Sequence, residues 1–287
     1  MKDLKGKVAA ITGAGSGIGR ALAIELAGRG CQLALSDIDG EGLTETAQQA
    51  QVTGVDVSTA VVDVSDRAAV FAWADRCRTT HGKVNLIFNN AGVALWSMAE
   101  TTQLIDFEWL MGTNFWGVIH GTQAFMPHLR ASGDGHVINI SSAFGLIAMP
   151  TQSVYNAAKF GVRGFTEALR MELELEGAPV SATCVHPGGV ATNIALAGRV
   201  DPALERISGV DAQTQRQRAH RMIQVSTPQA AALQIISGVE RNARRVLVGR
   251  DARRMDFFAR LLGAEYQRLV LNKVRQMVGA AARRKTA

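Results

Sequence analysis

The stretch VAAITGAGSGIG, residues 8–19, joins a short apolar run directly to a turn that is rich in glycine. The run 8–12 is apolar and bounded by turn residues, which predicts a buried β-strand. The following segment 18–30, IGRALAIELAGRG, repeats apolar residues at helical spacing and ends on glycine. Glycines at such a junction let backbone N–H groups approach a phosphate, which the positive end of the helix also stabilises. This junction therefore predicts an α/β fold with a dinucleotide phosphate site at its first turn.

The glycine spacing departs from the GxGxxG pattern. Counted from Gly13, the last glycine position falls on Ile18, and counted from Gly15 it falls on Arg20. The pattern present is TGxxxGxG, formed by Thr12, Gly13, Gly17 and Gly19. A glycine-rich turn can be purely structural, but its place between the first strand and a helix favours phosphate binding.

The same alternation of apolar runs and helical patterns continues through the first 190 residues. The predicted strands are 8–12, 31–36, 59–64, 84–89, 136–140 and 180–185, with 245–249 as a seventh. Strands that alternate with helices form parallel sheets with right-handed crossovers. We therefore predict a single-domain, Rossmann-like α/β fold: a doubly wound parallel sheet of about seven strands, flanked by helices on both faces.

Two later segments break this rhythm. Residues 193–225 show weak helical patterns and no strand, which favours a mobile substrate lid within a dinucleotide-binding and catalytic domain of residues 1–252. Residues 253–287 predict a basic, amphipathic, helical C-terminal extension. From residue 241 onward the chain has 13 Lys and Arg against 3 Asp and Glu, so the net charge of +6 comes from this tail. We therefore expect no nucleic-acid partner for the protein as a whole.

The bulk composition excludes several classes of protein. The three cysteines, Cys31, Cys77 and Cys184, are far apart and form no CxxC pair, which argues against a disulfide framework and against a metal site. The N-terminus lacks the apolar run of a signal peptide, and no stretch approaches the roughly 18 apolar residues of a membrane span. These features predict a cytoplasmic protein without a metal.

Acidic residues at the ends of the second and third predicted strands indicate how a cofactor would bind. Asp37 lies 24 residues after Gly13, where a carboxylate accepts hydrogen bonds from both ribose hydroxyls and repels a 2′-phosphate. Asp37 therefore favours NAD(H), while Arg20 keeps NADP(H) open as an alternative. Asp63 is a weaker candidate for the adenine edge.

Tyr155 and Lys159 are the candidates for the chemistry. They stand four residues apart in a helical pattern, so their side chains share a face. A nearby cation would lower the phenol pKa from about 10 toward the range that acid–base catalysis needs. Such pairs are more often a half-buried tyrosine with an exposed lysine. Ser142, at the end of a predicted strand 13 residues upstream, favours the catalytic reading.

The ordered motifs resemble the short-chain dehydrogenase/reductase family over about residues 5–250. They are TGAGSGIG, Asp63, NNAG (89–92), Asn114, Ser142, YNAAK (155–159) and PGGVAT (187–192). The resemblance implies an NAD(P)-dependent alcohol dehydrogenase or carbonyl reductase that works as a homotetramer or homodimer. Asn85, at a strand start where the family more often has aspartate, is a departure remote from the chemistry.

The resemblance also assigns roles to residues. Tyr155 would be the acid–base, Lys159 would lower its pKa and hold the nicotinamide ribose, and Ser142 would orient the carbonyl. Asn114 would support a water-linked proton path to the lysine. The implied cofactor contacts are Gly13, Ser16, Gly17, Ile18, Gly19, Asp37, Asp63, Val64, Asn90, Ala91, Gly92, Tyr155, Lys159, Pro187, Gly188, Val190 and Thr192.

The residues expected around the substrate are largely apolar. They are Ser142, Tyr155, Trp96, Phe144, Leu146, Met149 and Leu196. Such a lining predicts a hydrophobic, possibly bulky, secondary alcohol or ketone. Alternatives are another carbonyl class, such as a steroid or an acyl-thioester, and a non-catalytic dinucleotide-binding regulator. A serine hydrolase using Ser142 lacks the GxSxG and SxxK motifs.

The basic tail has several possible partners. Its apolar residues at helical spacing favour packing on the parent domain, capping of the pocket or contact between subunits. Attachment to a membrane surface is the less favoured alternative.

Overall fold

The computed structural model describes residues 3–283, with positions 207–208 and 277–283 described as backbone only. Its main sheet has seven parallel strands in the order β3-β2-β1-β4-β6-β7-β9. They are β1 (Val8–Thr12), β2 (Gln32–Asp37), β3 (Val57–Val61), β4 (Leu86–Asn89), β6 (Gly135–Ile140), β7 (Val180–Pro187) and β9 (Arg245–Val248). The doubly wound, Rossmann-like sheet that the sequence predicts is confirmed.

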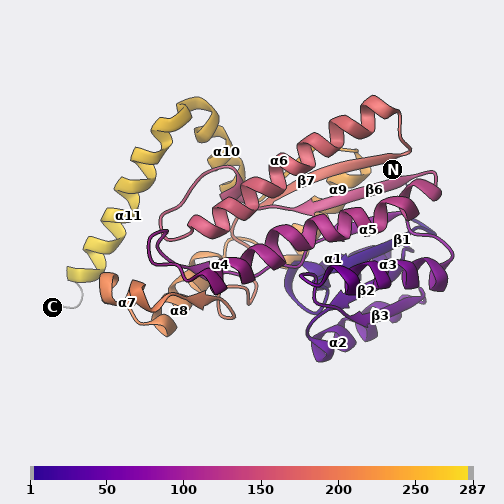
Figure 1. Cartoon of the computed structure of the whole chain (residues 1–287), viewed down its shortest axis with the longest axis horizontal. Helices are drawn as coiled ribbons and strands as arrows, with labels where there is room; N and C mark the ends of the chain where they lie inside the picture. Colours follow the sequence, from indigo (N-terminus) through magenta and orange to yellow (C-terminus); the bar gives the residue numbers. More distant parts are fainter. Residues whose placement is uncertain (1–2, 284–287) are drawn as a thin grey trace.

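Helices cover both faces of this sheet (Figure 1). One face packs against α1 (Gly17–Gly28), α2 (Gly40–Gln51) and α9 (Pro228–Glu240), through buried residues such as Leu22, Leu26 and Ile235. The other face packs against α3 (Arg67–His81), α5 (Gly117–Ala131) and α6 (Ser153–Glu176). There Trp73 and Phe125 meet edge to face, with ring centroids 5.0 Å apart. Burying apolar surface on both faces accounts for strands that are apolar along their whole length.

Local signals fix the ends of several helices. The carboxylate of Asp39 accepts a hydrogen bond from the Gly42 N–H at the start of α2, and Asp66 accepts one from Ala69 at the start of α3. α3 ends at Gly82, whose φ of 74° is left-handed. Such caps satisfy backbone groups that have no partner inside the helix.

The third strand, β3, begins two residues before the start and ends three residues before the end of the predicted range 59–64. Val62 and Val64 are buried, but they follow the end of β3 and pack as part of the turn toward α5. A Cβ on Gly117 of α5 would lie 2.7 Å from Val64 Cγ2, so the helix passes close to this turn. Because Val62 and Val64 are apolar and buried, the strand-like sequence pattern continues into the turn.

The predicted lid contains a strand that the sequence pattern does not reveal. β8 (Arg199–Val200) pairs in parallel with β5 (Leu95–Trp96) in a separate two-stranded sheet. α7 (Pro202–Ser208) and α8 (Ala212–Met222) follow. The expectation of no strand in residues 193–225 was therefore wrong, because two residues are too few to show an alternating pattern.

The chain after β9 is helical. α10 (Arg250–Leu262), the short η3 (Gly263–Glu265) and α11 (Tyr266–Arg283) form an arm at the end of the molecule remote from β2 and β3 (Figure 1). The remaining elements are α4 (Leu104–Met111), the π-helical η1 (Gly112–Trp116) and η2 (Ala143–Gly145). Among residues 3–283, no helix combines the length and apolar character needed to cross a bilayer.

Candidate active site

The carboxyl ends of β1 and β4 meet where the strand order reverses, which is the usual ligand crevice of an open α/β sheet. Thr12 holds these two ends together. Its Oγ1 accepts hydrogen bonds from the backbone N–H groups of Asn90 and Ala91, at 3.0 and 3.1 Å, and donates to the Phe88 carbonyl at 3.3 Å. The predicted NNAG motif is thus fixed beside the glycine-rich turn.

The glycine-rich turn has the close backbone approaches that only glycine permits. Gly13 and Gly17 have φ values of 65° and 52°, and a Cβ on Gly13 would lie 2.8 Å from the Ala91 Cα. A Cβ on Gly19 would collide with the Gly13 carbonyl. Asn90 donates from Nδ2 to the carbonyls of Thr12 and Gly13, at 2.9 and 3.1 Å. The Asn90 side chain therefore stabilises the backbone at the start of the turn.

The N-terminus of α1 is available to an anion. Ser16 is its exposed N-cap residue and makes no side-chain capping bond within the described chain. Gly17 and Ile18 follow it in the first turn, and a Cβ on Gly17 would lie 3.0 Å from the Thr192 methyl group. These residues form a cradle of backbone N–H groups and small side chains that fits a pyrophosphate.

Asp37 lies directly beside this cradle, at the end of β2. Its Oδ2 accepts a hydrogen bond from the Gly15 N–H at 2.7 Å, and its Oδ1 accepts one from the Asp39 N–H at 3.0 Å. The Arg20 guanidinium is engaged by other groups: it donates to the Gly15 carbonyl at 2.6 Å and pairs with the Glu45 carboxylate at 2.8 Å. The guanidinium is thereby held within the protein.

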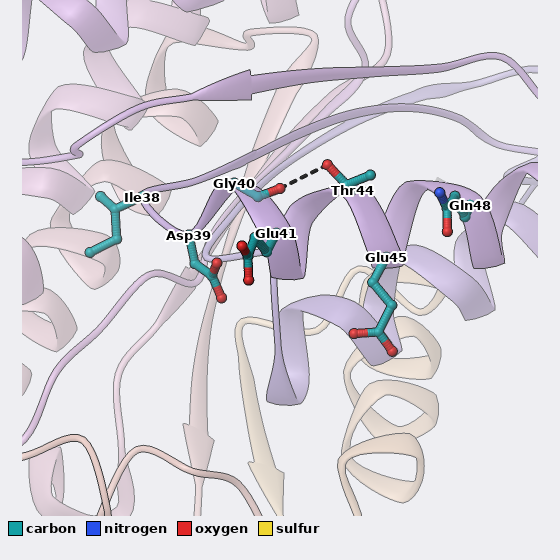
Figure 2. A pocket seen from close by; sticks show the side chains of 7 residues that line it. All are labelled: Ile38, Asp39, Gly40, Glu41, Thr44, Glu45 and Gln48. Carbon is teal, nitrogen blue, oxygen red and sulfur yellow. Dashed lines mark hydrogen bonds between the residues drawn. The ribbon is translucent and has the colours of Figure 1, made fainter.

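An open hollow of about 680 Å³ lies just beyond Asp37 (Figure 2). Its lining residues are Ile38, Asp39, Gly40, Glu41, Thr44, Glu45 and Gln48. Three of these seven residues are acidic, and Figure 2 shows the carboxylates of Asp39 and Glu41 next to each other at the start of α2. This surface disfavours a further phosphate group beside Asp37.

Asp63 lies in the exposed turn after β3. Its Oδ1 accepts hydrogen bonds from the Ser65 N–H and hydroxyl, at 2.8 and 2.7 Å. The neighbouring Val64 is buried, and His120 Nδ1 donates to its carbonyl at 3.0 Å. The turn is thus attached to α5 through Val64.

Tyr155 and Lys159 occupy successive turns at the start of α6, opposite Ser142. Tyr155 is half-buried and shares a hydrogen bond with Ser142, and the Phe144 ring meets it edge-on with centroids 6.3 Å apart. Lys159 is buried, with its Nζ 5.7 Å from the Tyr155 ring centroid. The structure therefore brings together the three side chains that the sequence selects.

The electrostatics of this group differ from the simple expectation. Burial raises the pKa of Tyr155, and the hydrogen bond with Ser142 opposes that rise. Burial also lowers the pKa of Lys159 to about 8, and its ammonium donates to the Ile140 carbonyl at 2.9 Å. In the protein alone the pKa of Tyr155 is therefore shifted upward by desolvation, opposite to the lowering that the sequence predicts from Lys159.

Asn114 joins this group from η1. Its side chain is fully buried: Oδ1 accepts a hydrogen bond from the Val93 N–H at 2.8 Å, and Nδ2 donates to the Val93 carbonyl at 2.9 Å. A Cβ on Gly92 would lie 3.3 Å from Asn114 Oδ1 and 3.7 Å from Lys159 Nζ. Gly92 therefore keeps the space open between the asparagine and the lysine. A π-helical turn at a functional residue is a common arrangement.

The PGGVAT segment closes the crevice after β7. Pro187 ends β7, and Gly189 donates its N–H to the Asp251 carboxylate at 2.6 Å. A Cβ on Gly188 would collide with the same carboxylate, so the loop lies tightly against the first turn of α10. Val190 is buried, and the Thr192 N–H donates back to its carbonyl at 2.8 Å. Asp251 is a supporting residue that no motif indicates.

The predicted substrate residues divide into two groups. Phe144 and Met149 are half-buried, Leu146 is buried, and all three lie in the loop between Ser142 and α6. Trp96 lies on β5 beneath the lid, where a Cβ on Gly198 would collide with its ring, while Leu196 is exposed. Leu146 also lines a second hollow of about 570 Å³ that reaches Tyr266 on the arm.

Arg199 of the predicted lid is already engaged and does not offer a free clamp for an acidic substrate. Arg199 pairs with Asp106 at 2.8 Å, and its guanidinium lies 3.9 Å from the Trp109 ring centroid. Arg206 is exposed on α7. The crevice beside Tyr155 therefore keeps an apolar character.

Asn156 has a structural role that the sequence reasoning missed. In the sequence it stands between the candidates Tyr155 and Lys159, where small residues leave room for a ligand. In the structure it is buried and donates to the carbonyls of Phe144 and Ile147, at 2.7 and 3.1 Å. It also accepts a hydrogen bond from the Met149 N–H at 3.0 Å. Asn156 therefore holds residues 143–152 on α6; this segment is called the substrate loop below, because it carries three of the predicted substrate residues.

His186 and Tyr266 are two further supporting residues. His186 Nδ1 donates to the Ser142 carbonyl at 2.9 Å, and burial lowers its pKa to about 4, so the ring is neutral. The Tyr266 hydroxyl accepts a hydrogen bond from the Ala148 N–H at 2.8 Å. The first supports the serine and the second joins the arm to the substrate loop. Only contacts distant in sequence reveal either role.

Comparison with known proteins agrees with this arrangement. The family described as short chain dehydrogenase matches residues 7–201. A Mycobacterium tuberculosis protein named "Putative oxidoreductase SadH" is 48% identical over 270 residues, which cover 94% of this chain and 96% of that protein. Estradiol 17-beta-dehydrogenase 11 of Macaca fascicularis is 37% identical over 207 residues, covering 71% of this chain and 69% of that protein.

Solved structures show the same architecture. A short chain dehydrogenase/reductase from Burkholderia phymatum, in complex with NAD, superposes with a TM-score of 0.78 at 33% identity. The match covers 86% of this chain and 90% of that chain.

Proposed function

This chain belongs to the short-chain dehydrogenase family of oxidoreductases, and from that premise we propose that it interconverts a hydrophobic secondary alcohol and its ketone with NAD(H). One observation supports this most directly: Ser142, Tyr155, Lys159 and Asn114 converge at the carboxyl ends of the central strands. That group lies at the same carboxyl edge of the sheet as the glycine cradle.

The residues present fit a nicotinamide dinucleotide. The cradle at Gly13–Gly19 suits the pyrophosphate, Asp37 suits the adenosine ribose, and Gly92 leaves space beside Lys159. When bound, the nicotinamide supplies or accepts the hydride. Every other task falls to the side chains of this chain.

Ser142 and Tyr155 would act on the substrate oxygen. Both hydroxyls can donate hydrogen bonds to that oxygen, where negative charge develops during reduction, and such donors stabilise the transition state. Tyr155 Oη would give up its proton in reduction and take one in oxidation. The raised pKa of Tyr155 in the protein alone keeps that proton in place until the Lys159 ammonium, next to a bound ribose, favours the phenolate. Asn114 would hold the path by which a proton returns to Lys159.

The preference for NAD(H) over NADP(H) rests on the surroundings of Asp37. The carboxylates of Asp37, Asp39 and Glu41 would repel a 2′-phosphate, and Arg20 is already paired with Glu45. A ratio of kcat/KM values that favours NAD(H) by at least about tenfold is the expected result.

An apolar, bulky substrate fits the residues beside Tyr155. Phe144, Leu146 and Met149 line one side, and the lid arginine Arg199 is held by Asp106. One relative is named for the dehydrogenation of estradiol at its 17-position. Estradiol is a hydrophobic molecule with a secondary alcohol at that position. A steroid or another bulky ketone is therefore the first substrate class to test. Preference for small polyols or acyl-thioesters would contradict this proposal.

A homo-oligomer in the cytoplasm completes the proposal. An exposed apolar surface over α4 and η1 offers the contact, with Leu104, Ile105 and Trp116 exposed by 70%, 72% and 51%. Covering such a surface with a second copy would remove apolar area from water. Light scattering with Ile105→Glu as the disrupting variant tests it, and an unchanged mass would contradict this contact.

Replacing Tyr155 by phenylalanine tests the catalytic assignment. We expect Tyr155→Phe to bind NAD(H) nearly as the parent does and to lose at least about a hundredfold in turnover, since general acid–base groups contribute about that much. Met171→Ser, at a site 61% exposed on the same helix, is the control. Turnover above about a tenth of the parent value would refute the role of Tyr155.

A further inference from the structure

The outer side of α10 carries large apolar side chains. Phe257, Phe258 and Leu261 are 60%, 47% and 65% exposed. Leu261 lies four residues after Phe257 and three after Phe258, so it neighbours both of them on the outer side of the helix. Three adjacent large apolar groups therefore face solvent.

Cations surround these apolar groups on the same face. Arg250, Arg253 and Arg254 are exposed and precede Phe257 by seven, four and three residues, which brings them onto its side of the helix. The two acidic residues of α10 point inward. Asp251 accepts the Gly189 N–H, and Asp256 pairs with Arg245 and Arg260. The described outer face of α10 thus carries positive charge without carboxylates.

The first half of α11 continues this character. Leu269 and Leu271 are 54% and 41% exposed, and Lys273 and Arg275 are exposed beside them. The sequence pattern favours packing of these apolar residues on the parent domain, capping of the pocket or contact between subunits over a membrane contact. In the structure the apolar residues of the arm are only partly buried, and its aromatic and cationic side chains share the outer surface.

The arm is firmly attached to the body. The Asp251–Gly189 hydrogen bond holds its start against the loop after β7, and the Tyr266 hydroxyl holds its bend on Ala148. Figure 1 shows α10 and α11 extending from that end of the molecule. The exposed side chains are therefore presented by a fixed scaffold.

We propose that α10 and the first half of α11 dock on an anionic phospholipid surface. Aromatic and leucine side chains enter the boundary between headgroups and acyl chains, while arginines bind the phosphates above it. Charge favours this partner over a second copy of the same face, since two such faces would oppose arginine to arginine. Tyr266 contacts the loop that carries Phe144 and Met149. Docking of the arm therefore brings the apolar side of the proposed substrate site near the lipid.

Co-flotation of the full-length protein with vesicles tests the proposal. The vesicles contain phosphatidylcholine alone or phosphatidylcholine mixed with phosphatidylglycerol, at low and high salt. We expect binding only to the mixed vesicles, and weaker binding at high salt. The variant Phe257→Ser/Phe258→Ser/Leu261→Ser should reduce binding by at least about tenfold, and Arg250→Gln/Arg253→Gln/Arg254→Gln should do the same.

Matched controls separate docking from general surface effects. Met171→Ser/Leu175→Ser removes apolar groups that are 61% and 92% exposed on α6, and Arg76→Gln/Arg78→Gln removes exposed charge from α3. Both should float as the parent does, and all variants should keep its thermal midpoint. Three results would overturn the proposal: no binding to the mixed vesicles, undiminished binding of the arm variants, or a fall in particle mass of the arm variants without a change in flotation.

Discussion

Asn156→Ala is expected to loosen the substrate loop while leaving the fold intact. The side chain is 7% exposed and makes three hydrogen bonds to the loop, to the carbonyls of Phe144 and Ile147 and from the N–H of Met149. Alanine removes all three bonds and leaves those backbone groups to find water. The other contacts of α6 with the sheet remain.

The structure sets the size of this effect. A typical internal hydrogen bond contributes about 0.5–1.5 kcal/mol net, so three of them hold the loop by roughly 1.5–4.5 kcal/mol. Since about 1.4 kcal/mol corresponds to a tenfold change in an equilibrium, loop opening should become at least about tenfold more frequent. The midpoint of global thermal unfolding should fall by less than the change in the free energy of loop opening suggests, because the loop lies at the edge of the core.

Two measurements follow from this. Hydrogen exchange of the segment around Met149 should speed up at least about tenfold, and kcat/KM for a bulky ketone should fall by a similar factor. The affinity for NAD(H) should stay near the parent value, because Asn156 touches none of the cradle residues that the structure describes. Glu172→Ala, an exposed change on the same helix, serves as the control.

The reasoning is refuted if exchange around Met149 and kcat/KM both match those of the control. An equal loss of NAD(H) affinity would also contradict it, because that would make Asn156 part of the cofactor site.

Two other changes test the cradle and the buried histidines. Gly19→Ala places a Cβ against the Gly13 carbonyl, so NAD(H) affinity should fall by at least about tenfold; calorimetric titration showing parent affinity would disprove this close approach. Burial lowers the pKa of His136 to about 3 and that of His186 to about 4, from 6.5. Since the unfolded chain binds these protons first, stability present above pH 6.5 should be lost as the pH falls toward 4. Urea unfolding between these limits should show it, less steeply in His186→Asn, and a flat profile would reject it.

Most of the fold follows from local sequence signals. The strands β1, β6 and β7 are buried along nearly their whole length, so they appear as short runs rich in apolar residues with clear ends. β3 is at the edge of the sheet and half exposed, and its buried neighbours Val62 and Val64 extend the pattern beyond the strand. The pair β5 and β8 is too short to leave a periodic signal.

The proximity of the candidate catalytic residues was predictable for a different reason. Ser142, Tyr155 and Lys159 stand at fixed offsets from strand ends, and parallel topology brings those ends to one edge of the sheet. The groups that support them have no such offset. Asp251 reaches Gly189 from 62 residues away, and Tyr266 reaches Ala148 from 118 residues away. Such contacts depend on tertiary packing, which no local pattern encodes.

The predicted direction of the Tyr155 pKa shift illustrates a further limit. A sequence shows that a cation stands four residues from the phenol, but it does not show how much water either group loses. In the structure that loss of water raises the pKa of the phenol and lowers the pKa of the ammonium. The balance of the two effects becomes visible only with the packing around them.

The lid of this protein is fixed at both of its ends. At one end the Asp201 N–H donates to the Trp96 carbonyl at 2.8 Å, beside the β5–β8 pair. At the other, Ser226 pairs with Gly189 and Ala191, at 3.1 and 2.8 Å. The free energy of closing a loop between two fixed points grows only slowly with its length. We therefore expect that segments of other lengths can replace residues 202–225 between Asp201 and Ser226 and change the size of substrate accepted, while the sheet and the candidate catalytic group stay as they are.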